Sequence, residues 1–232
     1  DSFATHNCFA KGQELVGHQG KAGRGIEPAS VEDIAKELMF LEDRSRTSTI
    51  YRECLVNGIP LHWGGMSDPF MPSIEKHYKI SLKTMEKLSW RQYPTCISTK
   101  SPLIAEEPYL SLLKQGNYVV QISIISDDKE FMRKIDYQAP SPRVRMQTLE
   151  KLSAAGIPTV GRIQPVIPGT VSEYQLGEFI TRLAKTGIYH ISLEGLKLNS
   201  KSPIIKLLPG LTRQFEQRQS FEAYMSPARK WK

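Results

Sequence analysis

The chain has 232 residues, of which 40% are hydrophobic and 24% are charged, a balance that supports one large folded domain and excludes wholesale disorder. Its formal net charge is +7, which permits contact with nucleic acid without requiring it, because no compact stripe of Lys and Arg stands out in the sequence. No apolar run is long enough to cross a bilayer and no signal peptide opens the chain, so we expect a cytoplasmic protein.

The first half of the chain alternates helical and extended patterns. Residues 30–44 ("SVEDIAKELMFLEDR") carry apolar side chains at helical spacing behind Ser30, which resembles an N-cap. A strand is expected at 59–65 ("IPLHWGG"), followed by a loop and one helix that continues to about residue 88. The next strand is expected at 93–100 ("YPTCISTK"), before a helical stretch at 106–116 ("EEPYLSLLKQG").

The second half continues the alternation. The run at 118–126 ("YVVQISIIS") is continuously apolar or β-branched, which predicts a strand buried on both faces. A helix is expected from Ser141 to Gly156, and a strand at 156–167 ("GIPTVGRIQPVI"). A final helix and strand are expected at 172–187 and 188–198.

Strand followed by helix, about five times over, predicts an α/β fold with a parallel sheet wrapped by helices. Such folds place their chemistry on loops at the carboxyl ends of the strands. Here those ends read "HWGGMSDPF", "STKSP", "SIISDD", "QPVIPG" and "LEGLK". Their Gly, Ser, Lys and Asp residues are typical of a polar ligand site.

The three cysteines are widely separated and odd in number, which argues against a disulfide framework. Cys54 and Cys96 lie in apolar surroundings and are expected to be buried as small hydrophobic side chains. Cys8 lies in the polar stretch "THNCFAKG", where a thiolate could meet a metal. Its loop should follow a first strand, and none precedes it, so we expect the chain to be a fragment or to lack residues near its start.

Five stretches, in order, resemble the radical S-adenosylmethionine (SAM) superfamily, in particular the branch that includes spore photoproduct lyase. They are "NCFAKG", "GGMSDPFMPSIEKHYKISLKTMEKL", "ISTKSPLI", "VVQISIIS" and "DYQAPSPRVRMQTLEKLSAAGIPTVGRIQPVIPG". The resemblance extends from Cys8 to Gly169. It implies a partial (β/α)6 TIM-like barrel of radical SAM type over residues 1–195, lacking its first strand, and a C-terminal extension at 196–232.

The resemblance also implies an enzyme with two cofactors, a [4Fe–4S] cluster and SAM. In this family the reduced cluster cleaves SAM to a 5′-deoxyadenosyl radical, which abstracts hydrogen from a substrate; an external donor supplies the electron. The substrate is unknown, with nucleic acid among the candidates. Cys8 matches a cluster ligand. The matched cofactor-binding residues are Gly64, Gly65 and Ser67 near the methionine amine, Asp68, Lys100 and Ser123 near the carboxylate or ribose, and Gly161, Ile163 and Ile167 near the adenine.

Two departures from the family pattern matter. The family spacing puts Asp1 and Thr5 where two further cluster cysteines belong, and oxygen ligands replace thiolates poorly. Either residues are missing there, which we favour, or the barrel has lost its cluster and binds SAM or nucleic acid without it. Gly65 also occupies the place of the cysteine hydrogen donor of spore photoproduct lyase, so we do not expect that repair reaction.

Several residues have structural as well as functional interpretations. Asp68 could contact SAM or cap the turn at Pro69, with little to choose between them. Arg145 is expected to form a surface ion pair with Glu150 nearby, and the role of Asp136 is open. A nucleic-acid module could instead use the basic loop at 17–25 and the tail at 226–232.

Overall fold

The computed structural model of the protein describes residues 30–38, 50–65, 67–167 and 172–195. Cys8, the basic loop at 17–25 and the extension at 196–232 lie outside these ranges, so what the sequence predicts for them stays a prediction. Within the described ranges, no helix combines the length and the apolar character needed to span a bilayer.

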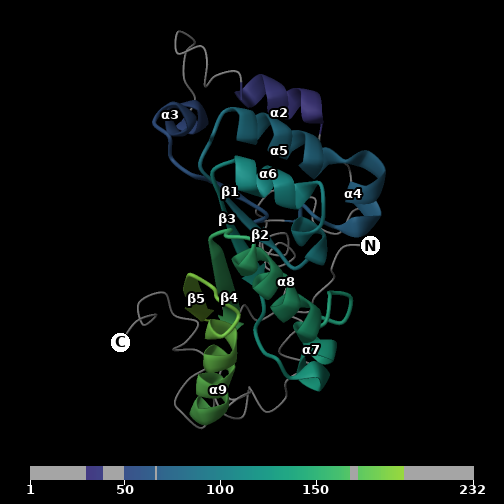
Figure 1. The fold of residues 1–232 in the computed structure, drawn as a ribbon, viewed down its shortest axis with the longest axis vertical. Helices are drawn as coiled ribbons and strands as arrows, with labels where there is room; N and C mark the ends of the chain where they lie inside the picture. The colour runs from purple at the N-terminus through teal and green to yellow at the C-terminus, as the bar shows by residue number, and fades with distance from the viewer. Residues whose placement is uncertain (1–29, 39–49, 66, 168–171, 196–232) are drawn as a thin grey trace, which may run out of the picture.

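The described residues form one sheet of parallel strands whose spatial order follows the chain order, β1-β2-β3-β4-β5. Parallel neighbours that are also consecutive in sequence need a crossover between them, and helices supply most of these crossovers (Figure 1). The strands are β1 (Leu61–Trp63), β2 (Thr95–Thr99), β3 (Tyr118–Ser123), β4 (Thr159–Val166) and β5 (His190–Gly195). This architecture confirms the α/β fold expected from the sequence.

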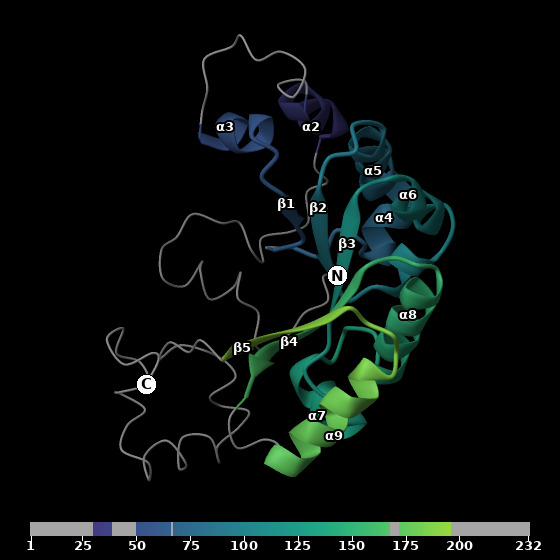
Figure 2. The same ribbon diagram turned by 60° about the vertical axis from the view of Figure 1, so that its left-hand side comes forward.

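Helices pack on one face of this sheet. They are α2 (Val31–Leu38), α3 (Ile50–Val56), α4 (Pro72–Tyr78), α5 (Ile80–Trp90), the 3-10 turn η2 (Pro102–Ala105), α6 (Tyr109–Gln115), α7 (Lys129–Ile135), α8 (Pro142–Ala154) and α9 (Glu173–Ala184). In Figure 2, α4 to α9 all lie on the same side of the strands. The core lies between the two layers and includes Ile97, Ile122 and Ile163 from the strands and Leu88, Leu149 and Leu183 from the helices.

The strands present two different faces because successive side chains of a strand alternate. The strand registers pair His62 with Cys96, Ser98 with Gln121, and Ser123 with Arg162, so these side chains share the face opposite the helix layer. We call this group of six residues the polar sheet face. The prediction that 118–126 is buried on both faces is therefore wrong for β3, where Val119 is 37% exposed. Its β-branched residues reflect strand propensity rather than two-sided burial.

Local signals in the sequence explain where helices begin and end. Ser141 caps α8 by accepting a hydrogen bond from the N–H of Val144, and Pro142 occupies its first turn. Ser172 and Gln175 form a capping box at the start of α9. The single helix expected before residue 88 is in fact two, α4 and α5, because Lys79 between them adopts a left-handed conformation with φ of 53°.

Glu75 explains how α5 can begin directly after this break. Its carboxylate is buried and accepts hydrogen bonds from the N–H groups of Ser81 and Leu82, each at 2.8 Å. These are two of the donors that the first turn of a helix leaves without intrahelical partners. The hydroxyl of Tyr109 also donates to Glu75 at 2.8 Å, which links both helices to α6.

Candidate cofactor and substrate site

The carboxyl ends of β1 and β2 are joined by Asp68. Its Oδ1 accepts hydrogen bonds from the hydroxyl of Thr99 at 2.6 Å and the N–H of Phe70 at 3.0 Å, and its Oδ2 accepts from the N–H of Lys100 at 2.7 Å. Burial raises the pKa of Asp68, although these bonds and the charge of Lys100 act in the opposite direction. The contacts support the turn-capping interpretation of Asp68, while its predicted contact with SAM stays a prediction.

A chain of three charged side chains continues from this junction. The ammonium of Lys100 lies 2.7 Å from Oδ1 of Asp136, and Nη2 of Arg145 lies 2.7 Å from Oδ2 of the same carboxylate. Arg145 also donates from Nε to the carbonyl oxygen of Pro140 and from Nη1 to that of Ser123, both at 2.8 Å. Through Ser123, the chain is fixed to the carboxyl end of β3. We call it the Lys100–Asp136–Arg145 triad.

The expectation that Arg145 forms a surface ion pair is wrong, because its side chain is only 1% exposed and its partner is Asp136. Helical spacing contains the signal that sequence reasoning missed, since Arg145, Leu149 and Leu152 share one face of α8. Leu149 and Leu152 are fully buried. A charged residue on a buried helical face needs a partner of opposite charge, and Asp136 meets that need.

The triad holds one carboxylate between two cations. Burial alone would raise the pKa of Asp136, but Lys100 and Arg145 outweigh it and hold that pKa below its ordinary range. Asp136 is therefore ionised at neutral pH. Lys100 is the one member that reaches the surface, with 22% of its side chain exposed against 4% for Asp136 and 1% for Arg145. The two buried members thus orient an accessible ammonium at the carboxyl edge of the sheet.

On the polar sheet face, the hydroxyl of Ser98 is the centre of a hydrogen-bond network. Ser98 donates to Oε1 of Gln121 at 3.1 Å and accepts from Nη1 of Arg162 at 3.2 Å. Nε2 of His62 lies 2.8 Å from the same oxygen. Because the hydroxyl has a single proton, which it donates to Gln121, the network is satisfied when Nε2 of His62 carries a hydrogen.

The charges on this face are arranged to keep its neighbours neutral. Burial lowers the pKa of His62, and the charge of Arg162 lowers it further, so the imidazole is neutral at pH 7. Burial raises the pKa of the Cys96 thiol more than Arg162 lowers it. The pKa of Arg162 is itself lowered by burial, against the opposing effects of Glu194 and Cys96. The face therefore presents a guanidinium, neutral hydrogen-bonding groups and a thiol.

The two glycines after β1 differ in the space around them. A Cβ on Gly64, whose φ is +97°, would lie 2.0 Å from the carbonyl oxygen of Ser98, so this glycine is required by strand packing. A Cβ on Gly65 would meet nothing closer than the His62 ring at 3.8 Å. The space beside Gly65 is therefore open, which suits the predicted close approach of a ligand there. Ser67 follows at the same strand end and is exposed.

The remaining predicted cofactor-binding residues lie in two environments. Ser123 belongs to the polar sheet face and is half-buried. Gly161 instead lies against α9, where an added Cβ would be 3.1 Å from Ile188, and Ile163 and Ile167 are 1% and 4% exposed. These two isoleucines border a cavity of about 10 Å³, whose other walls are Ile125, Phe131, Pro165, Val166 and Leu176. Their predicted contact with adenine stays a prediction.

The described residues contain no cluster of three His, Cys, Asp or Glu side chains able to hold a metal ion. Cys54 and Cys96 are both free and only half-buried, so the expectation that they are buried core thiols is not confirmed. The expected iron ligand, Cys8, lies outside the described residues. For SAM the fit is better: the accessible Lys100 ammonium can bind a carboxylate, and the space at Gly65 leaves room beside it.

Solved structures with the same arrangement of strands and helices are radical SAM enzymes. The match to spore photoproduct lyase complexed with dinucleoside spore photoproduct has a TM-score of 0.62 and 15% sequence identity, covering 94% of this chain and 59% of that one. The match to Streptococcus suis SuiB bound to S-adenosylmethionine has a TM-score of 0.54 and 14% identity, covering 86% and 42%. The described sheet and helices match partial barrels of radical SAM type.

Sequence comparison adds little to this structural result. No family model matches the chain. An uncharacterised protein, ORF301, of Acidianus two-tailed virus is 27% identical over 101 residues, which are 44% of this chain and 33% of the viral protein. The chain spans about half the length of the solved structures and a third of the viral relative. At these identities the comparisons establish the fold.

Sequence reasoning identified the strand ends but missed much of the site. It did not single out His62, Ser98, Gln121 or Arg162, and it left Asp136 and Arg145 without a role. Alternation within each strand was an available signal, because His62 flanks apolar positions in β1 and Ser98 shares its parity with Cys96 in β2. The pairing of Ser98 with Gln121 depends on strand register, which one strand alone does not reveal.

Proposed function

We propose that this protein is a radical SAM enzyme that binds SAM at the carboxyl edge of its sheet and acts on a polar substrate. The observation that carries the proposal is the Lys100–Asp136–Arg145 triad, which holds an accessible ammonium at the end of β2 in a fold that radical SAM enzymes share. The SAM-bound state of the structural neighbour SuiB supports the same assignment.

In this proposal each group has a defined task. Lys100 binds the SAM carboxylate, since an ammonium has three donors and Asp136 takes one of them. Backbone at Gly64 and Gly65, with Ser67, lies beside the methionine amine, and Cys8 is one ligand of a [4Fe–4S] cluster. When bound, the cluster and SAM supply reductive cleavage of SAM, which generates the radical that abstracts hydrogen.

The polar sheet face supports the second half of the proposal, that the substrate is polar. His62, Ser98, Gln121 and Arg162 offer hydrogen-bond donors and acceptors and one positive charge on the face that the helices leave uncovered. A buried apolar substrate would leave these groups without partners, which is costly. Spore photoproduct repair is not proposed, because Gly65 occupies the place of the required cysteine.

The test is cofactor binding by the full-length protein after anaerobic reconstitution with iron and sulfide. We expect about four irons per chain with broad visible absorbance, and loss of both in Cys8→Ala. Lys100→Met should weaken SAM binding at least about tenfold in equilibrium dialysis, because it removes the charged partner of the carboxylate. Lys114→Met, which removes an exposed lysine of α6, is the matched control and should bind SAM normally. Normal SAM affinity in Lys100→Met would contradict the assignment.

A second candidate is a barrel that has lost its cluster and binds SAM or nucleic acid without redox chemistry. The observation in its favour is the sequence at the cluster loop, where Asp1 and Thr5 stand at the positions expected for cysteines. Iron content separates the two proposals. Reconstituted full-length protein without iron, but with SAM affinity that depends on Lys100, would support the cluster-free binding protein.

A further inference from the structure

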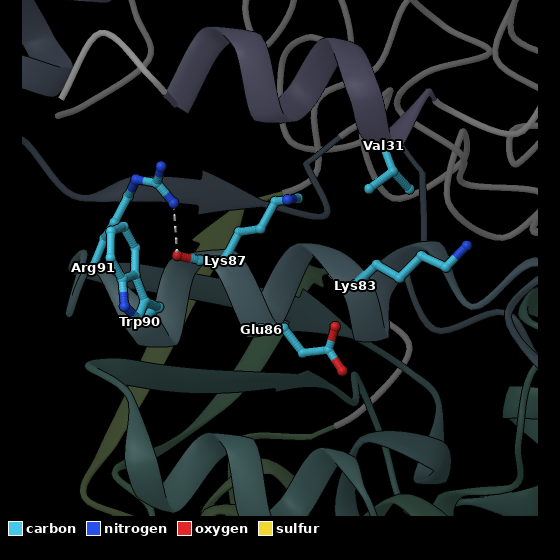
Figure 3. Close-up of a pocket in the computed structure, with 6 residues that line it drawn as sticks. All are labelled: Val31, Lys83, Glu86, Lys87, Trp90 and Arg91. Atoms are coloured by element: carbon cyan, nitrogen blue, oxygen red, sulfur yellow. Dashed lines mark hydrogen bonds between the residues drawn. The ribbon is translucent and has the colours of Figure 1, made fainter. Parts of the chain in front are cut away.

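The outer side of α5 carries a row of cations that the sequence analysis did not detect. Lys83, Lys87 and Arg91 are spaced four residues apart, so they follow one side of the helix at intervals of about 6 Å. In Figure 3 all three side chains extend toward α2. We call these three residues the α5 basic stripe. The statement that the chain has no compact stripe of Lys and Arg is therefore wrong for the folded protein.

The stripe lines a cleft of about 490 Å³ between α2 and α5, which Val31, Glu86 and Trp90 complete. Trp90 is 74% exposed, an unusual state for the most apolar aromatic side chain in the chain's described helices. The guanidinium of Arg91 lies 4.8 Å from the centre of the Trp90 ring. An aromatic ring and a row of cations thus border the same open cleft.

The acidic groups near the cleft leave the stripe positively charged. Glu86 is the one acidic residue that lines the cleft among the described residues, and Figure 3 shows its side chain on the side of α5 away from α2. On α2, Asp33 pairs with Lys36 at 3.4 Å, and the Glu32 carboxylate accepts a hydrogen bond from Ser30. Three cations against one outward-directed carboxylate favour an anionic ligand with several charges in a row.

We propose that the cleft between α2 and α5 binds single-stranded nucleic acid. The phosphates would contact the α5 basic stripe, and a base would stack on Trp90, which is how sequence-tolerant single-strand binding is usually built. A duplex hides its bases within the stack and could use only the cations, so the exposed indole favours a single strand.

This surface is separate from the proposed cofactor site. The buried side of α5, including Met85 and Leu88, packs into the core, so the helix layer and the sheet lie between the stripe and the polar sheet face. The proposal therefore does not depend on the proposed function. If both hold, the cleft would retain a nucleic-acid chain on the outside of a catalytic barrel.

The experiment is fluorescence anisotropy with a labelled oligothymidine single strand and the full-length protein at low salt. Counterion release predicts that the logarithm of the binding constant falls with the logarithm of salt with a slope of about −2 for three phosphate contacts. The triple variant Lys83→Gln/Lys87→Gln/Arg91→Gln should weaken binding by about tenfold or more and flatten that slope. Trp90→Ala should weaken binding about tenfold with little change in slope, because it removes a stacked base rather than a phosphate contact.

Matched controls separate the cleft from general charge and general exposure. Lys114→Gln/Lys134→Gln/Lys151→Gln removes the same charge from exposed positions on α6, α7 and α8, and Tyr174→Ala removes an aromatic residue that is 76% exposed on α9. Both control variants should bind like the wild type. Equal losses in the two triple variants would overturn the proposal in favour of diffuse charge attraction. Unchanged binding by Trp90→Ala, or equal affinity for a duplex of the same sequence, would overturn the single-strand assignment.

Discussion

Replacing Asp136 with Asn tests the physical basis of the candidate site. The substitution keeps the size of the side chain but removes the charge that Lys100 and Arg145 share at 2.7 Å each. Arg145 is 1% exposed, so its guanidinium would be left in the interior with carbonyl oxygens and a neutral amide as partners. Lys100 would then lie near a second, uncompensated positive charge.

The expected loss can be worked from this geometry. Removing one partner of a buried ion pair usually costs about 3–5 kcal/mol. The lower end, about 3 kcal/mol, applies here because the amide oxygen can still accept one hydrogen bond and Arg145 keeps its bonds to Pro140 and Ser123. For a protein of this size that is a fall in melting temperature of about 6–12 °C. Lys100→Met should cost only about 1 kcal/mol, since Asp136 keeps Arg145 and Lys100 is partly exposed.

Urea denaturation of the wild type and both variants at pH 7 measures these differences directly. The pH dependence gives a second test with a definite sign. The folded pKa of Asp136 is held below its unfolded value, so its contribution is complete above about pH 4 and is lost as the pH falls through the lower, folded pKa. The gap between wild type and Asp136→Asn should therefore narrow in acid. Equal stability of the two proteins at pH 7, or a larger loss in Lys100→Met, would refute the reasoning.

Three further results are expected. Gly64→Ala should lower the free energy of unfolding by at least about 2 kcal/mol, because of its positive φ and the backbone contact that a Cβ would make, whereas Gly65→Ala should stay within about 0.5 kcal/mol of wild type; urea denaturation of the pair would show whether these two losses differ. Arg162→Met should raise the pKa of His62 in an NMR titration by removing a nearby positive charge, without restoring its ordinary value, since burial is the larger cause; an unchanged or lower pKa would count against the network. Glu75→Ala should cost about 3 kcal/mol in the same denaturation assay by leaving two buried N–H groups of α5 unpaired, and a loss below about 1 kcal/mol would show that Glu75 is not the cap.

The strand–helix alternation could be predicted because each element carries its own local signals. Ser141 with Pro142 and the Ser172 capping box are properties of a few consecutive residues, and both occur in the structure as expected. The division between α4 and α5 could not be seen in this way. It depends on Glu75, which reaches across from one helix to supply the N-terminal bonds of the next.

The candidate site was predictable as a place but not as a set of contacts. The carboxyl ends of parallel strands meet at one edge, which is why Lys100 and Asp68 were expected there. Asp136 and Arg145 meet Lys100 only because α8 packs on β3 and brings a buried cation to the end of that strand. The α5 basic stripe shows the same limit, because residues four apart become a row only once the helix and its exposed side are known.

The most direct measurement of the central claim is the amount of 5′-deoxyadenosine formed by full-length, reconstituted protein under anaerobic conditions with dithionite and SAM. A radical SAM enzyme should release this nucleoside well above a protein-free blank, and Lys100→Met should release much less at the same SAM concentration while Lys114→Met matches the wild type. A yield no higher than the blank from protein that carries its full iron content would contradict the account.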